Sequence, residues 1–194
     1  MGKRDAIRLT DQDHVNTATH RAYVGGGAAD RNCALCSTAG AINLIQGKQL
    51  WTTGMIAETQ DRSDNREALG DDSVAQAQQI KNVVQALCGA RVAGELGGAG
   101  YNQGVALPQA MAWMANNFPV GTVFVLLASG GIGHHWLNGM LTAPGSVTYI
   151  DYQTDKVKKG QWNLGQVSKD DTPFHGVSGN QFENEATVYA IAFR

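Results

Sequence analysis

The hydropathy pattern of this chain changes character near Val120, and that change restricts the possible folds more than any other feature. Before Val120, apolar residues recur at helical spacing over 32–47 and 73–88. After it, residues 123–128 form a continuous apolar run typical of a central strand, and shorter strand patterns follow. Helices first and strands second is the order of an α+β domain, so we expect N-terminal helices packed on a C-terminal antiparallel sheet.

Local signals set the expected boundaries of these elements. The first helix begins with Asn32 as its N-cap and stops at Gly47. Ser73 and Gln76 match a capping box at the start of the second helix, and a third helix opens with Pro108 at its first position. The predicted strands are 123–128, 135–141, 147–152 and 185–193, with a turn over 142–145.

The remaining segments are rich in glycine or in polar residues. Glycine accounts for 24 of the 194 residues, well above the usual share of about 7%. Residues 94–104 are too glycine-rich for a regular element, and 51–72 read as a long loop with a short helical turn. We therefore expect a polar lead-in segment over 1–30 and one loop-rich globular domain over 31–194.

Composition excludes several classes of partner. The 15 Lys and Arg and the 17 Asp and Glu give a net charge of −2, so no basic surface is expected for nucleic acid or an anionic membrane. The longest apolar run is too short for membrane insertion, and the N-terminus lacks the apolar stretch of a signal peptide. Three cysteines cannot form a closed disulfide framework, which favours a cytosolic working compartment.

Two cysteines lie at the predicted start of the first helix. A helix N-terminus stabilises a thiolate through its unpaired backbone N–H groups and the positive end of the macrodipole. Cys33 lies where both effects are largest, whereas Cys36 lies one turn further in, where a buried and inert thiol is expected. Cys33 is therefore the candidate nucleophile.

The predicted hairpin brings candidate partners for that cysteine together. If the turn centres on Ala143, His135 lies directly opposite Asp151, and a slip of one residue puts His134 on the face of Asp151 instead. Opposed side chains have Cβ atoms about 4.5–5.5 Å apart, so either imidazole could be oriented by Asp151. Trp136 follows and could shield such an ion pair from water.

Redox and metal interpretations of the same residues are weaker. A thioredoxin-like site requires a strand before the Cys33-x-x-Cys36 pair, and none is predicted there. A structural zinc would require two further ligands, which only His134 and His135 could supply. No cofactor and no metal ion is therefore expected.

Three stretches in this order resemble the papain-fold toxin domains of bacterial polymorphic toxins and secreted effectors, whose better-understood relatives are glutamine deamidases. The matching stretches lie within residues 30–155. They are Asn32-Cys33-Ala34-Leu35-Cys36, His135-Trp136-Leu137-Asn138 and Ile150-Asp151-Tyr152-Gln153.

The resemblance implies a papain-like fold and assigns roles to individual residues. Cys33 is the nucleophile, His135 the base with His134 as the alternative, and Asp151 the residue that orients the imidazole. Gln153 braces the strand or the site. The side chain that completes the oxyanion hole is Gln12, Asn16 or Asn32.

The implied activity is that of a secreted or injected toxin that acts in the cytoplasm of a target cell. A cysteine-dependent hydrolase of this class deamidates a glutamine of a target protein, and a cognate immunity protein is an expected partner. The same triad would serve a cysteine protease, a transglutaminase or a cell-wall amidase. A catalytically retired binding module is the alternative outside enzymes.

Overall fold

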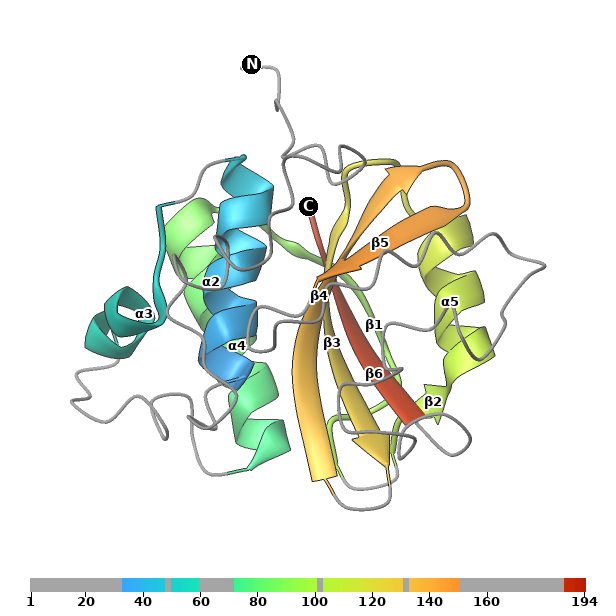
Figure 1. Ribbon diagram of the computed structural model, residues 1–194, viewed down its shortest axis with the longest axis horizontal. Helices are drawn as coiled ribbons and strands as arrows, with labels where there is room; N and C mark the ends of the chain where they lie inside the picture. Colours follow the sequence, from blue (N-terminus) through green and yellow to red (C-terminus); the bar gives the residue numbers. More distant parts are fainter. Residues whose placement is uncertain (1–32, 48–49, 60–71, 101–102, 131–132, 151–186) are drawn as a thin grey trace.

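The structure is a computed structural model that describes residues 33–47, 50–59, 72–100, 103–130, 133–150 and 187–194. These residues form a mixed helix and antiparallel-sheet fold, and helices cover both faces of the sheet (Figure 1). The α+β class predicted from the order of the hydropathy patterns is confirmed.

Helices precede most of the strands along the chain. The helices are α2 (Cys33–Gln46), α3 (Thr53–Thr59), α4 (Ser73–Cys88) and α5 (Leu107–Asn116). The strands are β1 (Val92–Leu96), β2 (Val105–Ala106), β3 (Val123–Gly130), β4 (Gly133–Ala143), β5 (Ser146–Ile150) and β6 (Thr187–Phe193).

The sheet has the order β1-β6-β3-β4-β5, with β2 also paired to β6, and its neighbouring strands are antiparallel. The run predicted as a central strand is β3, which pairs with β4 on one side and β6 on the other. The last strand of the chain, β6, therefore lies inside the sheet rather than at its edge. Its side chains from Val188 to Phe193 are buried accordingly.

Alternation along β3 divides the core into two parts. Val123, Val125 and Leu127 pack into a cluster that includes buried residues of α2, α3 and α4. The intervening residues, such as Phe124 and Leu126, pack with α5 on the opposite face. Figure 1 shows this arrangement, with α2, α3 and α4 on one side of the sheet and α5 on the other.

The helix α2 is the most deeply buried helix of the fold. Its residues from Ala34 to Ile45 are all buried, which fits a helix enclosed by the sheet on one side and by α3 and α4 on others. The predicted end is confirmed, because the helix stops at Gln46 and Gly47 takes the left-handed conformation with φ 64°. The predicted N-cap, Asn32, lies outside the described residues.

The start of α4 differs from the predicted capping box. Asp72 is the N-cap, and its side chain accepts a hydrogen bond of 2.8 Å from the backbone N–H of Ala75. Ser73 instead donates its hydroxyl to the carbonyl of Ala99. The side chain of Gln76 accepts a hydrogen bond from the indole of Trp136. Both predicted capping residues thus make tertiary contacts, which local spacing does not reveal.

The register of the hairpin between β4 and β5 differs from the predicted one by two residues. The structure pairs Ile150 with Asn138, where the prediction required Trp136. The turn lies at Pro144 and Gly145, which has a φ of 72°, and a β-bulge interrupts the pairing next to it. A displaced turn and an extra residue in β4 together account for the shift.

Two short strands that the sequence did not predict lie at the two ends of the glycine-rich segment 94–104. The segment connects β1 to β2, and both strands pair with β6. A Cβ at Gly104 would lie 2.8 Å from the backbone N of Val188 and 2.9 Å from the side chain of Thr187. Glycine is therefore required where this connection passes close to β6.

This close approach predicts that Gly104→Ala destabilises the fold by about 1–3 kcal/mol, because backbone atoms must shift to admit the methyl group. Gly54→Ala is the matched control, since the nearest atom to its Cβ would be 3.8 Å away. We expect the control to lie within about 0.5 kcal/mol of the wild type. Urea unfolding followed by circular dichroism measures both, and equal midpoints for the two variants would contradict the prediction.

Candidate active site

The helix α2 begins at the predicted nucleophile. Cys33 is half-buried, and it packs against the cluster that α2 shares with the sheet. The first backbone N–H groups of a helix have no partner within the helix, and the macrodipole is positive there. Cys36 is 1% exposed within the core, as expected for an inert thiol. None of the three cysteines, which all lie in the described ranges, forms a disulfide.

The two adjacent histidines of β4 lie on opposite faces of the sheet. His134 shares its face of the strand with Trp136, two residues further on, which packs in the α2 cluster. His135 shares the other face with Leu137, which packs with α5. The structure therefore places His134, and not His135, on the face that carries Cys33. The residue favoured as the base by the motif points away from α2, and the alternative histidine points toward its side.

The imidazole of His134 is held by a residue that sequence reasoning missed. Ser129 of β3 lies directly opposite His134, and its Oγ lies 2.7 Å from Nδ1 of the ring. The available signal was the glycine-rich connection between the strands, because β3 ends at Gly130 and β4 begins at Gly133. A tight turn at these glycines predicts that residues at equal distances on either side of it face each other.

A buried hydrogen bond connects α2 to the histidine strand. The side-chain amide of Asn138, which is fully buried, donates a hydrogen bond of 2.9 Å to the carbonyl of Ser37. Figure 1 shows that α2 and β4 run in the same direction and begin at the same end of the molecule.

The same hydrogen bond relates Cys33 to His134. Going back from it, Cys33 lies about 6 Å along the helix, and His134 lies about 13 Å along the strand. Both groups therefore lie toward the same end of the α2–β4 interface, and His134 lies about 7 Å further along it than Cys33 does.

Trp136 lies between His134 and Asn138 on this face and is 1% exposed. Its indole N–H donates a hydrogen bond of 2.8 Å to Gln76 of α4. Its ring packs edge-on against Tyr189, with ring centroids 6.3 Å apart. Trp136 is thus a fixed part of the core on the same face as His134, and its role in shielding an ion pair stays a prediction.

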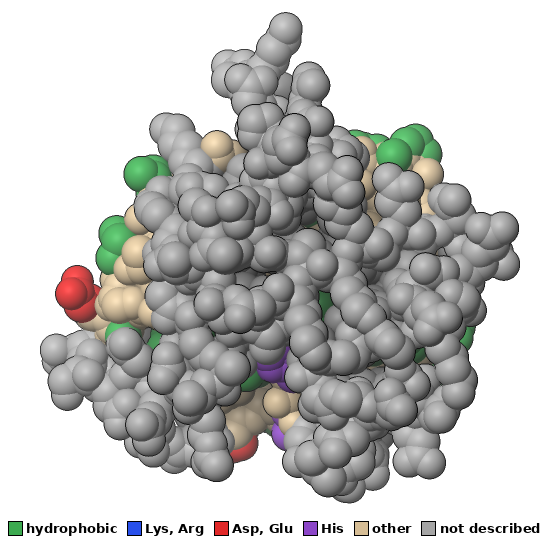
Figure 2. Space-filling model, viewed as in Figure 1, with side chains coloured by type: hydrophobic (Ala, Val, Ile, Leu, Met, Phe, Trp, Pro, Cys, Tyr) green, Lys and Arg blue, Asp and Glu red, His purple; other side chains and the backbone are tan. Residues whose placement is uncertain are grey.

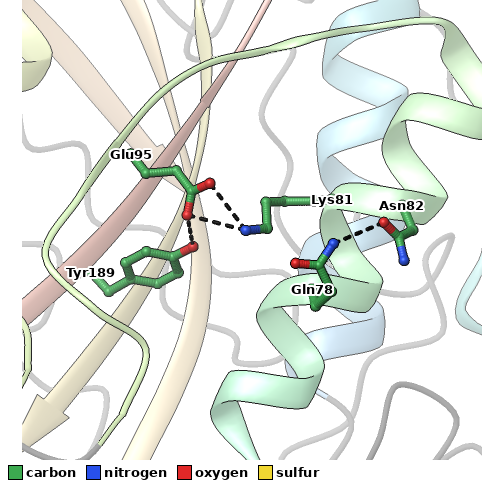
Figure 3. A network of polar contacts seen from close by, with 5 residues as sticks. All are labelled: Gln78, Lys81, Asn82, Glu95 and Tyr189. Atoms are coloured by element: carbon green, nitrogen blue, oxygen red, sulfur yellow. Dashed lines mark hydrogen bonds and ion pairs between the residues drawn. The ribbon is translucent and has the colours of Figure 1, made fainter.

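A polar network extends from Tyr189 to the surface of α4 (Figure 3). The hydroxyl of Tyr189 donates to Glu95, which also accepts from Lys81 at 3.0 Å. Burial raises the pKa of Glu95, but the hydrogen bonds from Tyr189 and Lys81 and the charge of Lys81 outweigh it and hold the pKa below its ordinary value of 4.5. Burial first, and then the hydrogen bond to Glu95 and its charge, raise the pKa of Tyr189.

Figure 2 shows histidine side chains (purple) at the surface, low in the middle of the view. Within the part of the chain that the structure describes, the histidines are His134, which is exposed, and His135, which is 8% exposed. An imidazole is therefore accessible from outside on this side of the molecule.

Several predicted site residues lie outside the described residues. They are the candidate orienting residue Asp151, its neighbour Gln153, and the three candidates for the oxyanion hole, Gln12, Asn16 and Asn32. Their roles stay predictions.

Within the described ranges, no group of three or more histidine, cysteine or carboxylate side chains is placed to hold a metal ion. None of the described helices is both long enough and apolar enough to span a membrane. No family model, curated protein or solved structure matches this chain. The chemistry of the site therefore has to be argued from the residues themselves.

The network around Glu95 predicts a pH-dependent contribution to stability. Because the pKa of Glu95 is lower in the folded protein, its ionised form stabilises the fold above pH 4.5, and this contribution is lost as the pH falls through the folded-state pKa. We expect Glu95→Gln to unfold more easily than the wild type at pH 7. The difference is at most about 1 kcal/mol, because this ion pair is partly exposed to water.

The measurement is urea unfolding of both proteins between pH 3 and pH 7. The difference in unfolding free energy should shrink as the pH falls below 4.5. Glu58→Gln, which changes an exposed side chain of α3, is the control and should give a smaller difference at pH 7. A constant difference between wild type and Glu95→Gln across the whole range would show that the carboxylate charge is not responsible.

Proposed function

We propose that this domain is a cysteine-dependent hydrolase of papain-like architecture that deamidates a glutamine side chain of a target-cell protein. One observation carries the proposal. The half-buried Cys33 begins a helix that packs on β4, on the face where β4 presents His134 with its Nδ1 held. Nucleophilic catalysis by cysteine requires a thiol and an oriented imidazole that can reach it, and here a thiol at a helix N-terminus and such an imidazole share one face of the sheet.

The architecture supports the papain-like part of the proposal. A papain-like core combines a helix that begins with the nucleophile and an antiparallel sheet that supplies the histidine. Here α2 begins with Cys33 and packs against β4, where both histidines lie. The match to the family motifs favours His135, but strand alternation favours His134 as the base because only His134 shares the face of α2.

The reaction proceeds in two steps. The imidazole of His134 accepts the thiol proton, and Cys33 Sγ attacks the side-chain amide carbon of the substrate glutamine, with the backbone N–H of Cys33 facing the oxyanion. The imidazolium then gives its proton to the leaving nitrogen, so that ammonia departs and a thioester remains. In the second step the same imidazole deprotonates a water molecule, which attacks the thioester and releases glutamate and the thiol.

The remaining elements of the proposal follow from the family resemblance. The protein is a secreted or injected bacterial toxin that acts in the target-cell cytoplasm, with Asp151 and Gln153 supporting the site, and a cognate immunity protein protects the producing cell. The same two steps would cleave a peptide bond in a substrate whose main chain reached Cys33.

Substitutions at three residues test the proposal. We expect Cys33→Ala to abolish activity, and His134→Ala to lower it by about 10²–10⁴-fold because the general base is lost. His135→Ala is the matched control, since His135 lies on the opposite face of the sheet, and it should retain most of the activity of a folded protein. Circular dichroism establishes that each variant folds.

The activity is measured by proteomics on cells that express each variant, scoring both glutamine-to-glutamate changes and new chain ends. A glutamate that appears with the wild type and is absent with Cys33→Ala supports deamidation. New chain ends that depend on Cys33 support the protease alternative instead. Identical maps for wild type and Cys33→Ala in every compartment would overturn the enzymatic proposal and favour a binding module.

A further inference from the structure

A second candidate for the residue that orients the base lies on β3. The resemblance gives this role to a carboxylate, Asp151, on the strand pattern that follows β4. The structure instead places a hydroxyl on the preceding strand, where Ser129 Oγ lies 2.7 Å from Nδ1 of His134. We propose that Ser129 is the positioning residue of this site, and that it accepts a hydrogen bond from Nδ1–H and leaves Nε2 of His134 unprotonated for the thiol.

The surroundings of Ser129 support a fixed geometry. Ser129 is 8% exposed and lies in the central strand β3, between His134 of β4 and Thr187 of β6. The backbone of a central strand is held by hydrogen bonds on both sides, so the Cβ atom of Ser129 is fixed opposite His134. The hydrogen bond at Nδ1 therefore orients the plane of the ring, and its direction sets the nitrogen that carries the proton.

The tautomer decides whether His134 can act as a base. A neutral imidazole carries its proton on one nitrogen and accepts a hydrogen bond at the other. If Ser129 accepts from Nδ1–H, the lone pair lies on Nε2, which is the nitrogen at the far side of the ring from β3. If Ser129 donated to Nδ1 instead, Nε2 would carry the proton and could not receive the one that Cys33 releases.

This inference rests on the proposed function for its consequence, but its central claim is measured without activity. Nitrogen-15 NMR of histidine-labelled full-length protein distinguishes the protonated ring nitrogen from the unprotonated one, and His134→Gln identifies the signals of His134 by their loss. We expect the Nδ1–H tautomer in the wild type and a shift of population to Nε2–H in Ser129→Ala. We also expect alkylation of Cys33 by iodoacetamide to slow by about 10²-fold in Ser129→Ala, because the base is misplaced.

Two further variants make the test specific. Thr187→Val removes the hydroxyl of the residue that lies opposite Ser129 on β6 and should leave the tautomer of His134 unchanged. Asp151→Asn should also leave it unchanged if Ser129 has the proposed role. An Nε2–H tautomer in the wild type, or a tautomer that changes in Asp151→Asn but not in Ser129→Ala, would overturn the proposal.

The two proposals fail in distinguishable ways. In one outcome the wild type shows the Nδ1–H tautomer, Ser129→Ala loses it, and Cys33 is alkylated no faster in the wild type than in His134→Gln. This result supports the hydrogen bond between Ser129 and His134 and overturns the pairing of His134 with Cys33. The positioning role of Ser129 in catalysis would then be overturned with it. A fast alkylation that is unaffected by Ser129→Ala overturns the positioning role alone.

Discussion

The hydrogen bond from Asn138 to the carbonyl of Ser37 is the interaction on which the geometry of the site depends. It lies in the fully buried contact between α2 and β4. The Oδ1 atom of the same side chain has no hydrogen-bond partner among the described residues, and leaving such an acceptor buried typically costs about 1–3 kcal/mol. An aliphatic residue would avoid that cost, but it would not fix the position of α2 along the strand, as a directional bond does. Since Cys33 lies one turn before Ser37, fixing Ser37 also fixes the start of the helix relative to β4.

Polarity increases along the α2 face of the sheet toward the end where β4 begins. Phe193, Val123 and Met140 form one apolar row across three strands. Two rows further along, Tyr189, Leu127 and Trp136 combine apolar rings with polar atoms that have partners in Gln76 and Glu95. The last row contains hydroxyl and imidazole groups only, from Thr187, Ser129 and His134. The reactive groups thus lie where the core ends, and the aromatic layer separates them from the apolar interior.

The sequence predicted the elements better than the contacts between them. Periodicity located α2 and α4, the apolar run located β3, and Gly47 marked a helix end, because each depends on residues close in the chain. The roles of Ser73 and Gln76 were wrong, because both side chains bond to residues distant in the sequence. The strands β1 and β2 escaped prediction because pairing with β6 stabilises them despite the glycines in and after β1.

The same limit applies to the candidate site, where position along the chain and position in space give different answers. Cys33 could be selected from the sequence, since a helix start is a local property. The order of motif residues favoured His135, because its spacing to Asn138 fits the family pattern. The pleat of β4 reverses the preference, since successive side chains point to opposite faces and only His134 shares a face with Asn138 and α2.

A neutral orienting group also fits the other half of the pair. Cys33 begins α2, and the N-terminus of a helix carries unpaired backbone N–H groups and the positive end of the macrodipole. An imidazole that begins neutral, with its lone pair on Nε2, can accept the thiol proton directly. A carboxylate at Nδ1 would both orient the ring and stabilise the imidazolium, whereas Ser129 orients the ring without adding a charge. Ser129 would thus perform one of the two tasks of a carboxylate, orienting the base, and would leave the imidazolium without a counter-charge at Nδ1.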